Sequence, residues 1–434
     1  MAVGRTVVIP HLGRVEGHGG IFVRVDGGRV SHVEMDIFEG SRYYEALLKG
    51  KHFGEVQGII TRICAICSAS HTVTALQALE KAMGVTVSER VHDLRGLLLL
   101  GATIESHALH VFALALPDFL GYESVLAMAG DYREEVVQAL KLKQLGNRIQ
   151  ELIGGRAVHP VNTLVGGFGK LPSHRDLEML LRDLEQSLPV LDRFVDLAAT
   201  IPLPDLGHNP TVYVALRPYQ EAFRFRGVSI CTSRGEEFPL ESYREVIREF
   251  TVEHSHAKHA ALEAGETYMV GSLARVKLWG HYLQGRARKA MDKLIPSRDG
   301  DNPLLNNWAQ LVELVHSVER SIEICQELLG RPEERQDLVP YQVRAGRGIG
   351  AIEVPRGTLF HEYELDEDGR VLEANVITPT AQNLANLERD LREAVERTLE
   401  ANPQVPDRDL KLRLEMVARA YDPCISCSVH LVRA

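Results

Sequence analysis

The stretches Arg62-Ile63-Cys64-Ala65-Ile66-Cys67 and Asp422-Pro423-Cys424-Ile425-Ser426-Cys427 each contain a Cys-x-x-Cys pair, and they lie near opposite ends of the chain. Four thiolates in two such pairs suffice to hold a soft metal centre. Because Cys64 and Cys424 are about 360 residues apart, a shared site requires a fold that brings both chain ends together. This requirement constrains the fold and the function more tightly than any other feature.

The composition is that of an ordinary globular protein. The chain has 434 residues, 45% hydrophobic and 25% charged, which is enough apolar material for a sizeable core. Its net charge of −10 and the absence of a basic tract argue against a nucleic-acid partner. Four of the six cysteines stand in the two pairs. Reduced thiols or metal ligands are therefore a better interpretation than a disulfide framework.

No segment predicts export or a membrane span. The chain does not begin with a basic region followed by an apolar one, so no signal peptide is expected. The longest apolar stretch, 97–116, is interrupted by Glu105, Ser106, His107 and His110, which favours a buried helix. We therefore expect a soluble, cytoplasmic protein with no direct membrane insertion.

The hydrophobic pattern predicts an α+β protein that is mainly helical. Apolar residues at three- and four-residue spacing predict helices at 41–49, 71–84, 92–116, 133–153, 173–199, 240–268, 304–329, 381–400 and 407–420. Strands are expected at 5–9, 21–25, 30–35, 211–216, 223–230, 350–354, 359–365 and 370–377. Loops rich in Pro and Asp are expected at 201–210, 293–303 and 331–340.

Nothing in the sequence divides the chain into separate domains, because it contains no repeat, low-complexity tract or long linker. We expect one domain over 1–434. Its parts would be an N-terminal β region at 1–40, a helical body at 41–420 with β insertions near 211–230 and 350–377, and a C-terminal metal-binding segment at 421–434.

Spacing alone leaves two other uses of the four thiols open. One is a structural zinc site, although zinc ribbons usually place their two knuckles within a few tens of residues. The other is a thioredoxin-like redox pair, which would leave the second Cys-x-x-Cys unexplained.

The surroundings of the two pairs are more specific. The first pair continues to His71 and the second to His430, which gives R-x-C-x-x-C-x-x-x-H and D-P-C-x-x-C-x-x-H. Three further segments complete a set of five motifs: Arg14-Val15-Glu16-Gly17-His18, Ser106–His110 running on to Pro117-Asp118, and Val354-Pro355-Arg356-Gly357. In this order the motifs resemble the large subunit of nickel–iron hydrogenases, most closely the soluble cofactor-coupled (bidirectional or sulfhydrogenase alpha-like) group.

This resemblance covers the whole chain and implies a fold with a central helix bundle and small peripheral β elements. It implies reversible heterolytic cleavage of H2. Cys64 and Cys424 would be terminal thiolates on nickel, while Cys67 and Cys427 would also bridge to an iron. Maturation proteins would supply that iron's carbon monoxide and cyanide ligands. A terminal thiolate such as Cys424 can accept a proton, and Glu16 would be the next acceptor.

The resemblance also implies the surroundings of the centre. Arg356 would lie over it, where a guanidinium can donate to cyanide without losing its charge. Asp118 and Asp422 would pair with Arg356 and orient it. Three other side chains, Arg62, His71 and Thr380, would line the site. His71 would hydrogen-bond a bridging sulfur, and Thr380 would contact a cyanide.

A second, hard cation is also implied, usually magnesium. Glu45 and His430 would be its side-chain ligands, and a backbone carbonyl near Val376 or Ile377 would complete them together with water. Imidazole is an unusual partner for such an ion, so His430 is carried by the resemblance alone.

The remaining histidines are interpreted as structural. His254, His256 and His259 form an H-x-H-x-x-H cluster within the predicted helix 240–268. One helix cannot turn all three inward, so a solvated polar face is favoured over a metal site. His107 and His110 are three residues apart on an apolar helix, where hydrogen-bonded core histidines are expected.

Electron transfer must involve other chains. Cys231 and Cys325 are expected to be ordinary buried thiols, so too few cysteines remain for an iron–sulfur cluster. Gly346-Arg347-Gly348-Ile349-Gly350 lacks the strand-turn-helix frame of a nucleotide site, so no flavin or nicotinamide is expected in this chain. The partners would be an iron–sulfur small subunit and further redox subunits of the diaphorase or heterodisulfide-reductase type.

Two other classes of protein remain possible, and the sequence departs from the family pattern at two places. The quinone-site subunit of respiratory complex I is related but should lack the cysteines, and a zinc-binding scaffold would use them without redox chemistry. Ala65 stands where the family commonly has glycine. Four residues, 431–434, follow His430, which favours a subtype whose tail is not removed.

Overall fold

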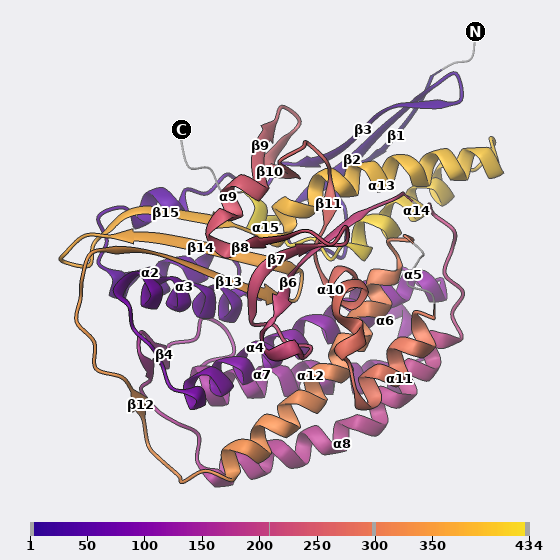
Figure 1. Cartoon of the computed structure of the whole chain (residues 1–434). Coiled ribbons are helices and arrows are strands. Elements are labelled where there is room, and N and C mark those ends of the chain that lie inside the picture. Colours follow the sequence, from indigo (N-terminus) through magenta and orange to yellow (C-terminus); the bar gives the residue numbers. More distant parts are fainter. Residues whose placement is uncertain (1–3, 208, 297–300, 430–434) are drawn as a thin grey trace.

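The structure, a computed structural model, describes residues 4–207, 209–296 and 301–429 and confirms a mainly helical α+β protein (Figure 1). Its long helices are α3 (Ser68–Met83), α4 (Glu89–Leu109), α7 (Arg133–Gly154), α8 (His174–Ala199), α12 (Leu305–Leu329), α13 (Pro379–Ala401) and α14 (Asp407–Ala420). Shorter helices include α1 (Tyr44–Leu48), α2 (Phe53–Ile60), α5 (Leu116–Leu120), α6 (Val125–Met128) and α15 (Ile425–Ser428). The strands form several small sheets at the edges of this helical body.

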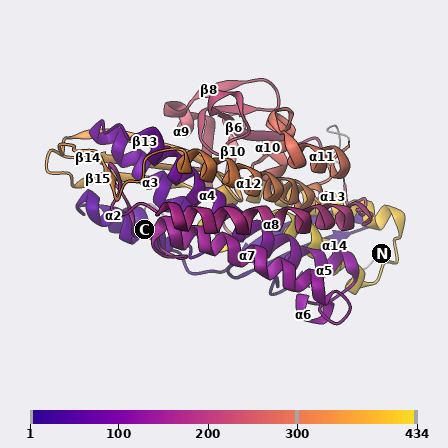
Figure 2. The same cartoon turned by 90° about the horizontal axis from the view of Figure 1, so that it is seen from below.

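Helices α4, α7, α8 and α12 pack on one another as a bundle, which forms the lower side of the molecule in Figure 1 and crosses the middle of the view in Figure 2. Helices α4 and α7 cross at Gly101 and Gly146. A Cβ added to Gly146 would lie 2.5 Å from the amide nitrogen of Glu105, so the absence of a side chain there lets the two backbones approach closely.

Helix α4 is the apolar stretch noted in the sequence. It continues through a π-helical segment, His110–Ala115, into α5. The composite helix is long and apolar enough to cross a membrane, but 83% of its most apolar window is buried inside the protein. It therefore behaves as the core helix of the bundle.

The N-terminal region forms an antiparallel sheet in the order β1 (Arg5–Ile9), β2 (Gly19–Asp26) and β3 (Arg29–Ile37). The turn between β2 and β3 contains Gly27 and Gly28, both with positive φ. This confirms the hairpin predicted from the sequence.

A second antiparallel sheet consists of β13 (Gly346–Val354), β14 (Gly357–Leu365) and β15 (Val371–Ile377), close to the predicted strands. Strand β13 lies directly on α3, the helix that begins after Cys67. Cβ atoms on Gly346, Gly348 and Gly350 would come within 2.2 Å of backbone carbonyl oxygens of α3. The glycine-rich motif is thus a packing face on which the backbone of α3 rests.

The predicted helix over 240–268 is wrong. Its start forms a 3-10 turn and α9 (Tyr243–Val246), but the chain then folds into the hairpin β9 (Ile247–Val252) and β10 (Ser255–Leu262). Ile247, Phe250 and Val252 favour a strand because branched and aromatic side chains pack well on a pleated surface. Tyr243, Val246, Ile247 and Phe250, however, stand at the three- and four-residue spacing of a helix, which explains the error.

Other small elements surround this hairpin. Strands β6 (Val212–Pro218), β7 (Gly227–Thr232), β8 (Glu237–Pro239) and β11 (Tyr268–Met269) form one sheet, and β4 (Thr163–Leu164), β5 (Gly167–Phe168) and β12 (Asp337–Leu338) form another. Helices α10 (Ser272–Trp279) and α11 (Gly285–Leu294) were not predicted, and neither was α2.

One apolar core joins the two ends of the chain. It contains side chains from Val7 to Val429 and includes the four paired cysteines. Both cysteine pairs therefore lie in the same core, as a shared site requires.

Candidate metal centre

The first cysteine pair lies where a short 3-10 turn, Thr61–Ile63, gives way to α3. Cys64 is extended, and Cys67 occupies the N-cap position of α3. The backbone amide of Cys67 lies 3.4 Å from Cys64 Sγ and donates to it. An amide that donates to sulfur favours the thiolate form of that sulfur.

The second pair is fixed by the start of α13. The Cys424 amide donates to Thr380 Oγ1 at 3.0 Å, and Thr378 Oγ1 donates to the Cys427 carbonyl at 2.9 Å. Asp422 has φ = +48°, a left-handed conformation that is uncommon for a residue with a side chain. Hydrogen bonds from Arg356 and Gln310 to Asp422 stabilise this conformation, which directs Cys424 and Cys427 toward the first pair.

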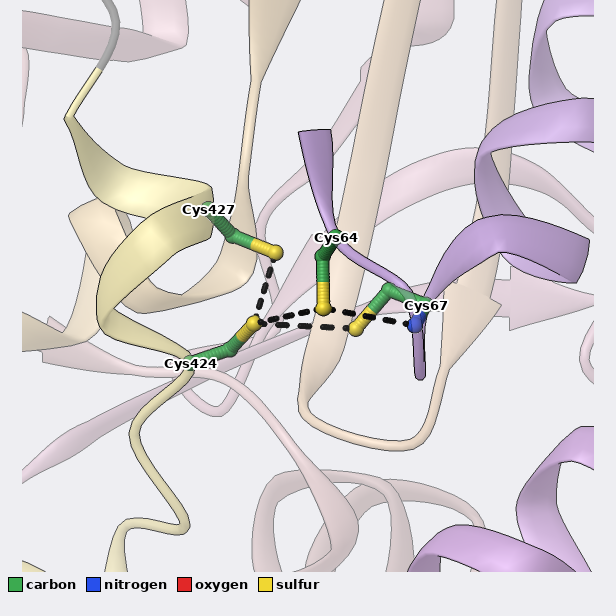
Figure 3. A group of neighbouring side chains, drawn as sticks. All are labelled: Cys64, Cys67, Cys424 and Cys427. Atoms are coloured by element: carbon green, nitrogen blue, oxygen red, sulfur yellow. Dashed lines mark hydrogen bonds between the residues drawn. The ribbon is translucent and has the colours of Figure 1, made fainter. Parts of the chain in front are cut away.

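The four thiols converge on one point (Figure 3). Cys424 Sγ lies 2.7 Å from Cys427 Sγ, 3.3 Å from Cys64 Sγ and 3.8 Å from Cys67 Sγ. All four sulfurs lie within 4.8 Å of one another, and all four residues are buried free cysteines. This is the donor set that a soft transition-metal ion requires.

The surroundings of the cluster shift the pKa values of its thiols in opposite directions. Hydrogen bonds from the other three thiols lower the pKa of Cys64, and the nearby Arg356 charge acts in the same direction. Burial raises the pKa of Cys424 and of Cys427. A bound cation would take the place of the protons that burial retains.

Glu16 reaches the cluster from the N-terminal segment. Its Oε2 lies 3.3 Å from Cys424 Sγ and accepts the Ser426 amide at 3.0 Å, while Ser426 Oγ donates to Oε1. Gly17, with φ = +87°, lets the chain pass the second pair, because a Cβ there would lie 2.7 Å from Cβ of Ile425. The carboxylate is therefore held against a single cysteine.

Arg356 is buried beside the sulfurs. Its Nε donates to the Asp422 carbonyl at 2.7 Å and its Nη2 to Asp422 Oδ1 at 2.9 Å, while Nη1 lies 3.5 Å from Cys67 Sγ. Gln310 donates to the other carboxylate oxygen, Asp422 Oδ2, at 3.0 Å. Two hydrogen bonds to one residue fix the plane of the guanidinium and stabilise the left-handed turn at Asp422.

The expected pairing of Asp118 with Arg356 is wrong. Asp118 Oδ2 accepts from Arg419 Nη1 at 2.6 Å, and its Oδ1 accepts from Arg14. No hydrogen bond joins Asp118 to Arg356 within residues 4–207, 209–296 and 301–429. Arg419, at the end of α14, also donates to the Gly13 carbonyl at 2.9 Å, so its guanidinium joins α5 to the segment that carries Glu16.

His71 lies on the side of Cys427, with its Nε2 4.0 Å from that sulfur. Its Nδ1 is 3.0 Å from His361 Nε2, and His361 Nδ1 is 2.7 Å from the Tyr363 hydroxyl. Sequence analysis missed His361 and Tyr363. They lie two residues apart on β14, and side chains at that spacing lie on the same face of a strand, so strand periodicity could have identified both.

The side chain of Arg62 does not reach the sulfurs in the described part of the chain. It is exposed, and its backbone carbonyl accepts from the Tyr44 hydroxyl at 2.5 Å. This corrects the expectation that Arg62 lines the centre, because Arg62 is the middle residue of the 3-10 turn and its two neighbours, Thr61 and Ile63, are the ones that face the core.

Glu45, the expected ligand of a second cation, is buried at 1% exposure. Burial raises the pKa of its carboxyl, whereas the nearby Lys258 charge and the backbone of Glu45 and Val376 lower it. Lys258 also pairs with Glu249 at 2.8 Å. Such a buried carboxylate fits a site for a hard cation. His430 lies outside the described residues.

Comparison with known proteins agrees with this site. The model of the nickel-dependent hydrogenase family matches residues 42–136 and 264–430, which contain all four cysteines. The chain belongs to this family. It is thus the large subunit of a hydrogenase, an oxidoreductase that acts on H2, and the four-cysteine cluster is its nickel-binding site.

Individual relatives place the chain more closely. It is 42% identical to sulfhydrogenase 1 subunit alpha of Pyrococcus furiosus and 36% identical to sulfhydrogenase 2 subunit alpha of the same organism, covering 98% and 97% of this chain and 98% of each relative. An NAD+-reducing [NiFe]-hydrogenase structure superimposes with a TM-score of 0.89 at 27% identity, over 98% of this chain and 99% of that one. The fold and the bidirectional or sulfhydrogenase-like grouping are therefore confirmed.

Proposed function

We propose that this chain splits H2 with Cys424 and Glu16 as its first two proton carriers. The 3.3 Å separation of Cys424 Sγ and Glu16 Oε2 carries the proposal. When bound by the four thiolates, a nickel–iron centre with carbon monoxide and cyanide ligands supplies the site at which H2 is polarised and gives up two electrons. The Cys424 thiolate accepts the first proton, and the Glu16 carboxylate takes it from the sulfur.

The other residues hold the reacting groups in place. Arg356 presents a fixed cation beside Cys67 and stabilises negative charge at the centre without giving up a proton. Asp422 orients Arg356, while His71 donates toward Cys427 from the opposite side. The interlocked pairs Arg14–Asp118 and Asp118–Arg419 are positioning contacts that secure the segment before Glu16.

A second cation, magnesium or another divalent ion, is proposed at Glu45 and the backbone near Val376, together with His430. It would neutralise the buried carboxylate and tie the C-terminal segment to the core. Its role would be structural.

Electrons leave through partners. We propose an iron–sulfur small subunit, further redox subunits, a cytoplasmic location and maturation proteins that assemble the centre. The names of the relatives mark them as subunits of larger assemblies, and one solved relative reduces NAD+. This chain itself would bind no flavin or nicotinamide.

Elemental analysis and infrared spectroscopy of the purified, matured complex test this function. About one nickel per chain is expected at the four-thiolate site, with infrared bands of metal-bound carbon monoxide and cyanide. Zinc alone at this site would support a scaffold, and the absence of metal would support a quinone-site relative. If those bands are missing from fully matured complex, the assignment fails.

A further inference from the structure

Two histidines and a glutamate meet outside the cysteine cluster, where separate parts of the chain come together. His254 lies in the turn between β9 and β10, His259 lies on β10, and Glu388 lies on α13. One ligand atom from each lies within 4.8 Å of the others. The sequence interpretation of His254 and His259 as a solvated helical face is wrong, because a hairpin turns both toward α13.

The contacts converge on one carboxylate oxygen. His254 Nε2 is 2.7 Å and His259 Nε2 is 3.5 Å from Glu388 Oε1. In a tetrahedral zinc site, ligand atoms about 2.0 Å from the ion lie about 3.3 Å apart. The observed separations bracket this value. His254 is partly exposed, so its ring can adjust.

His259 supplies the observation that points to a cation. Its side chain is 1% exposed, and its Nε2 makes no hydrogen bond to any residue that the structure describes. Its Nδ1 faces the Ala257 carbonyl at 3.4 Å. A carbonyl only accepts hydrogen bonds, so Nδ1 is the ring nitrogen that donates, and Nε2 faces the Glu388 oxygen with no hydrogen bond between them. Both atoms are of the kind that bind a metal ion, so a cation between them would give each a partner.

Outer contacts complete the pattern of a metal site. His254 Nδ1 faces Glu34 Oε1 on β3 at 3.6 Å, and Glu34 is also 2.5 Å from His32 Nε2. The Met35 amide donates to Glu388 Oε1 at 2.9 Å. Metal-bound histidines commonly direct their second nitrogen at a carboxylate or a backbone carbonyl. Here His254 has the first arrangement and His259 the second.

We propose that His254 Nε2, His259 Nε2 and Glu388 bind a zinc-type divalent cation, with water as the fourth ligand. Two imidazoles and one carboxylate are a donor set that suits Zn2+. Two carboxylates, Glu34 and Glu388, balance its charge. The ion joins β3, the β9–β10 hairpin and α13, and so braces the helix whose first turn holds Cys424.

The neighbouring His256 provides a matched control. It lies in the same hairpin, but it is exposed and its Nδ1 contacts the Glu39 carbonyl at 3.0 Å. His256→Gln should therefore leave the proposed site intact. His259→Gln and Glu388→Gln each remove one ligand, and the glutamine at 388 can still accept the Met35 amide.

The test uses the purified complex after addition of Zn2+ and removal of unbound metal, with zinc and nickel measured together. Compared with the wild-type complex, His259→Gln and Glu388→Gln should each lose one equivalent of zinc per chain, whereas His256→Gln should lose none. Nickel should be unchanged in all three. Crystals of the wild-type complex should show an anomalous peak at the zinc edge between His254 and His259.

The proposal is overturned if the wild-type and His259→Gln complexes hold the same zinc and no anomalous peak is present. His259 would then contact Glu388 without a metal ion between them. Should His259→Gln fail to fold, Glu388→Gln and the anomalous peak still decide. Because nickel is counted in the same samples, failure of this site is distinguishable from failure of the hydrogenase centre.

Discussion

Glu16 and Cys424 lie next to each other as a parallel backbone pair, although 408 positions separate them in the chain. The Ile425 amide donates to the Glu16 carbonyl at 2.9 Å. This main-chain contact sets the distance between the carboxylate and the sulfur, so proton transfer between them depends on backbone rather than on a flexible side chain. The two motifs are therefore one structural unit.

The first prediction concerns Glu16→Gln. Glutamine keeps the shape and can still accept the Ser426 amide, but it cannot take a proton from Cys424. Nickel content should be unchanged, while H2 oxidation by the purified complex should fall by at least about 100-fold. Glu364→Gln, at an exposed position on β14, is the control and should retain full activity. Wild-type turnover in Glu16→Gln would rule out the relay.

The second prediction concerns Arg356→Lys. Lysine keeps the positive charge but cannot donate at once to the Asp422 carbonyl, to the Asp422 carboxylate and toward Cys67. We expect H2 oxidation to fall by about 10- to 100-fold with nickel retained. Arg408→Lys, at an exposed position on α14, should have little effect. Equal activity in both variants would mean that Arg356 contributes charge alone.

Much of the site could be predicted because its residues stand in short motifs. The two cysteine pairs, Glu16 and Arg356 each lie within a recognisable segment, and a metal site requires such segments to meet. The partner of Asp118 could not be predicted, because it depends on how α5 and α14 end relative to each other. A carboxylate near two buried arginines takes whichever guanidinium the packing brings closer.

The fold, too, could be predicted from the sequence only in part. Long helices with one apolar face were predicted nearly to their ends, since periodicity extends over many turns. The segment 240–268 was not, because Tyr243, Val246, Ile247 and Phe250 have helical spacing, while Ile247, Phe250 and Val252 also have side chains that favour a strand. Pairing with β10 decides between them, and that pairing is a tertiary interaction. The error also hid the cluster of His254, His259 and Glu388.

The third prediction concerns pH. Asp390 is buried, and this burial raises its pKa from 3.8 to about 6, against hydrogen bonds from Tyr421 and Asn209. A raised pKa means that the folded chain holds the proton more tightly than the unfolded chain. The stabilisation is complete below about pH 4 and is lost as pH rises through 6, a change of about 3 kcal/mol.

Asp390→Asn cannot ionise and should lack this dependence. Thermal unfolding of the complex should show the melting temperature of the variant rising relative to wild type between about pH 4 and pH 6.5, the range set by the two pKa values. Asp409→Asn, at an exposed position on α14, should follow wild type throughout. Parallel curves for Asp390→Asn and wild type would show that Asp390 titrates normally.

The fourth prediction tests whether the glycine-rich strand positions the first cysteine pair. A Cβ on Gly348 would lie 2.1 Å from the Ala78 carbonyl oxygen, so Gly348→Ala must push α3 away from β13. Overpacking of this kind costs about 1–3 kcal/mol, and the displaced α3 carries Cys67 at its start. We expect a lower melting temperature and reduced nickel content in the purified complex. Gly58→Ala, on α2 with open space around its Cβ, should leave both unchanged or raise stability slightly. Full nickel content in Gly348→Ala would mean that the Cys64–Cys67 loop holds its geometry independently of α3.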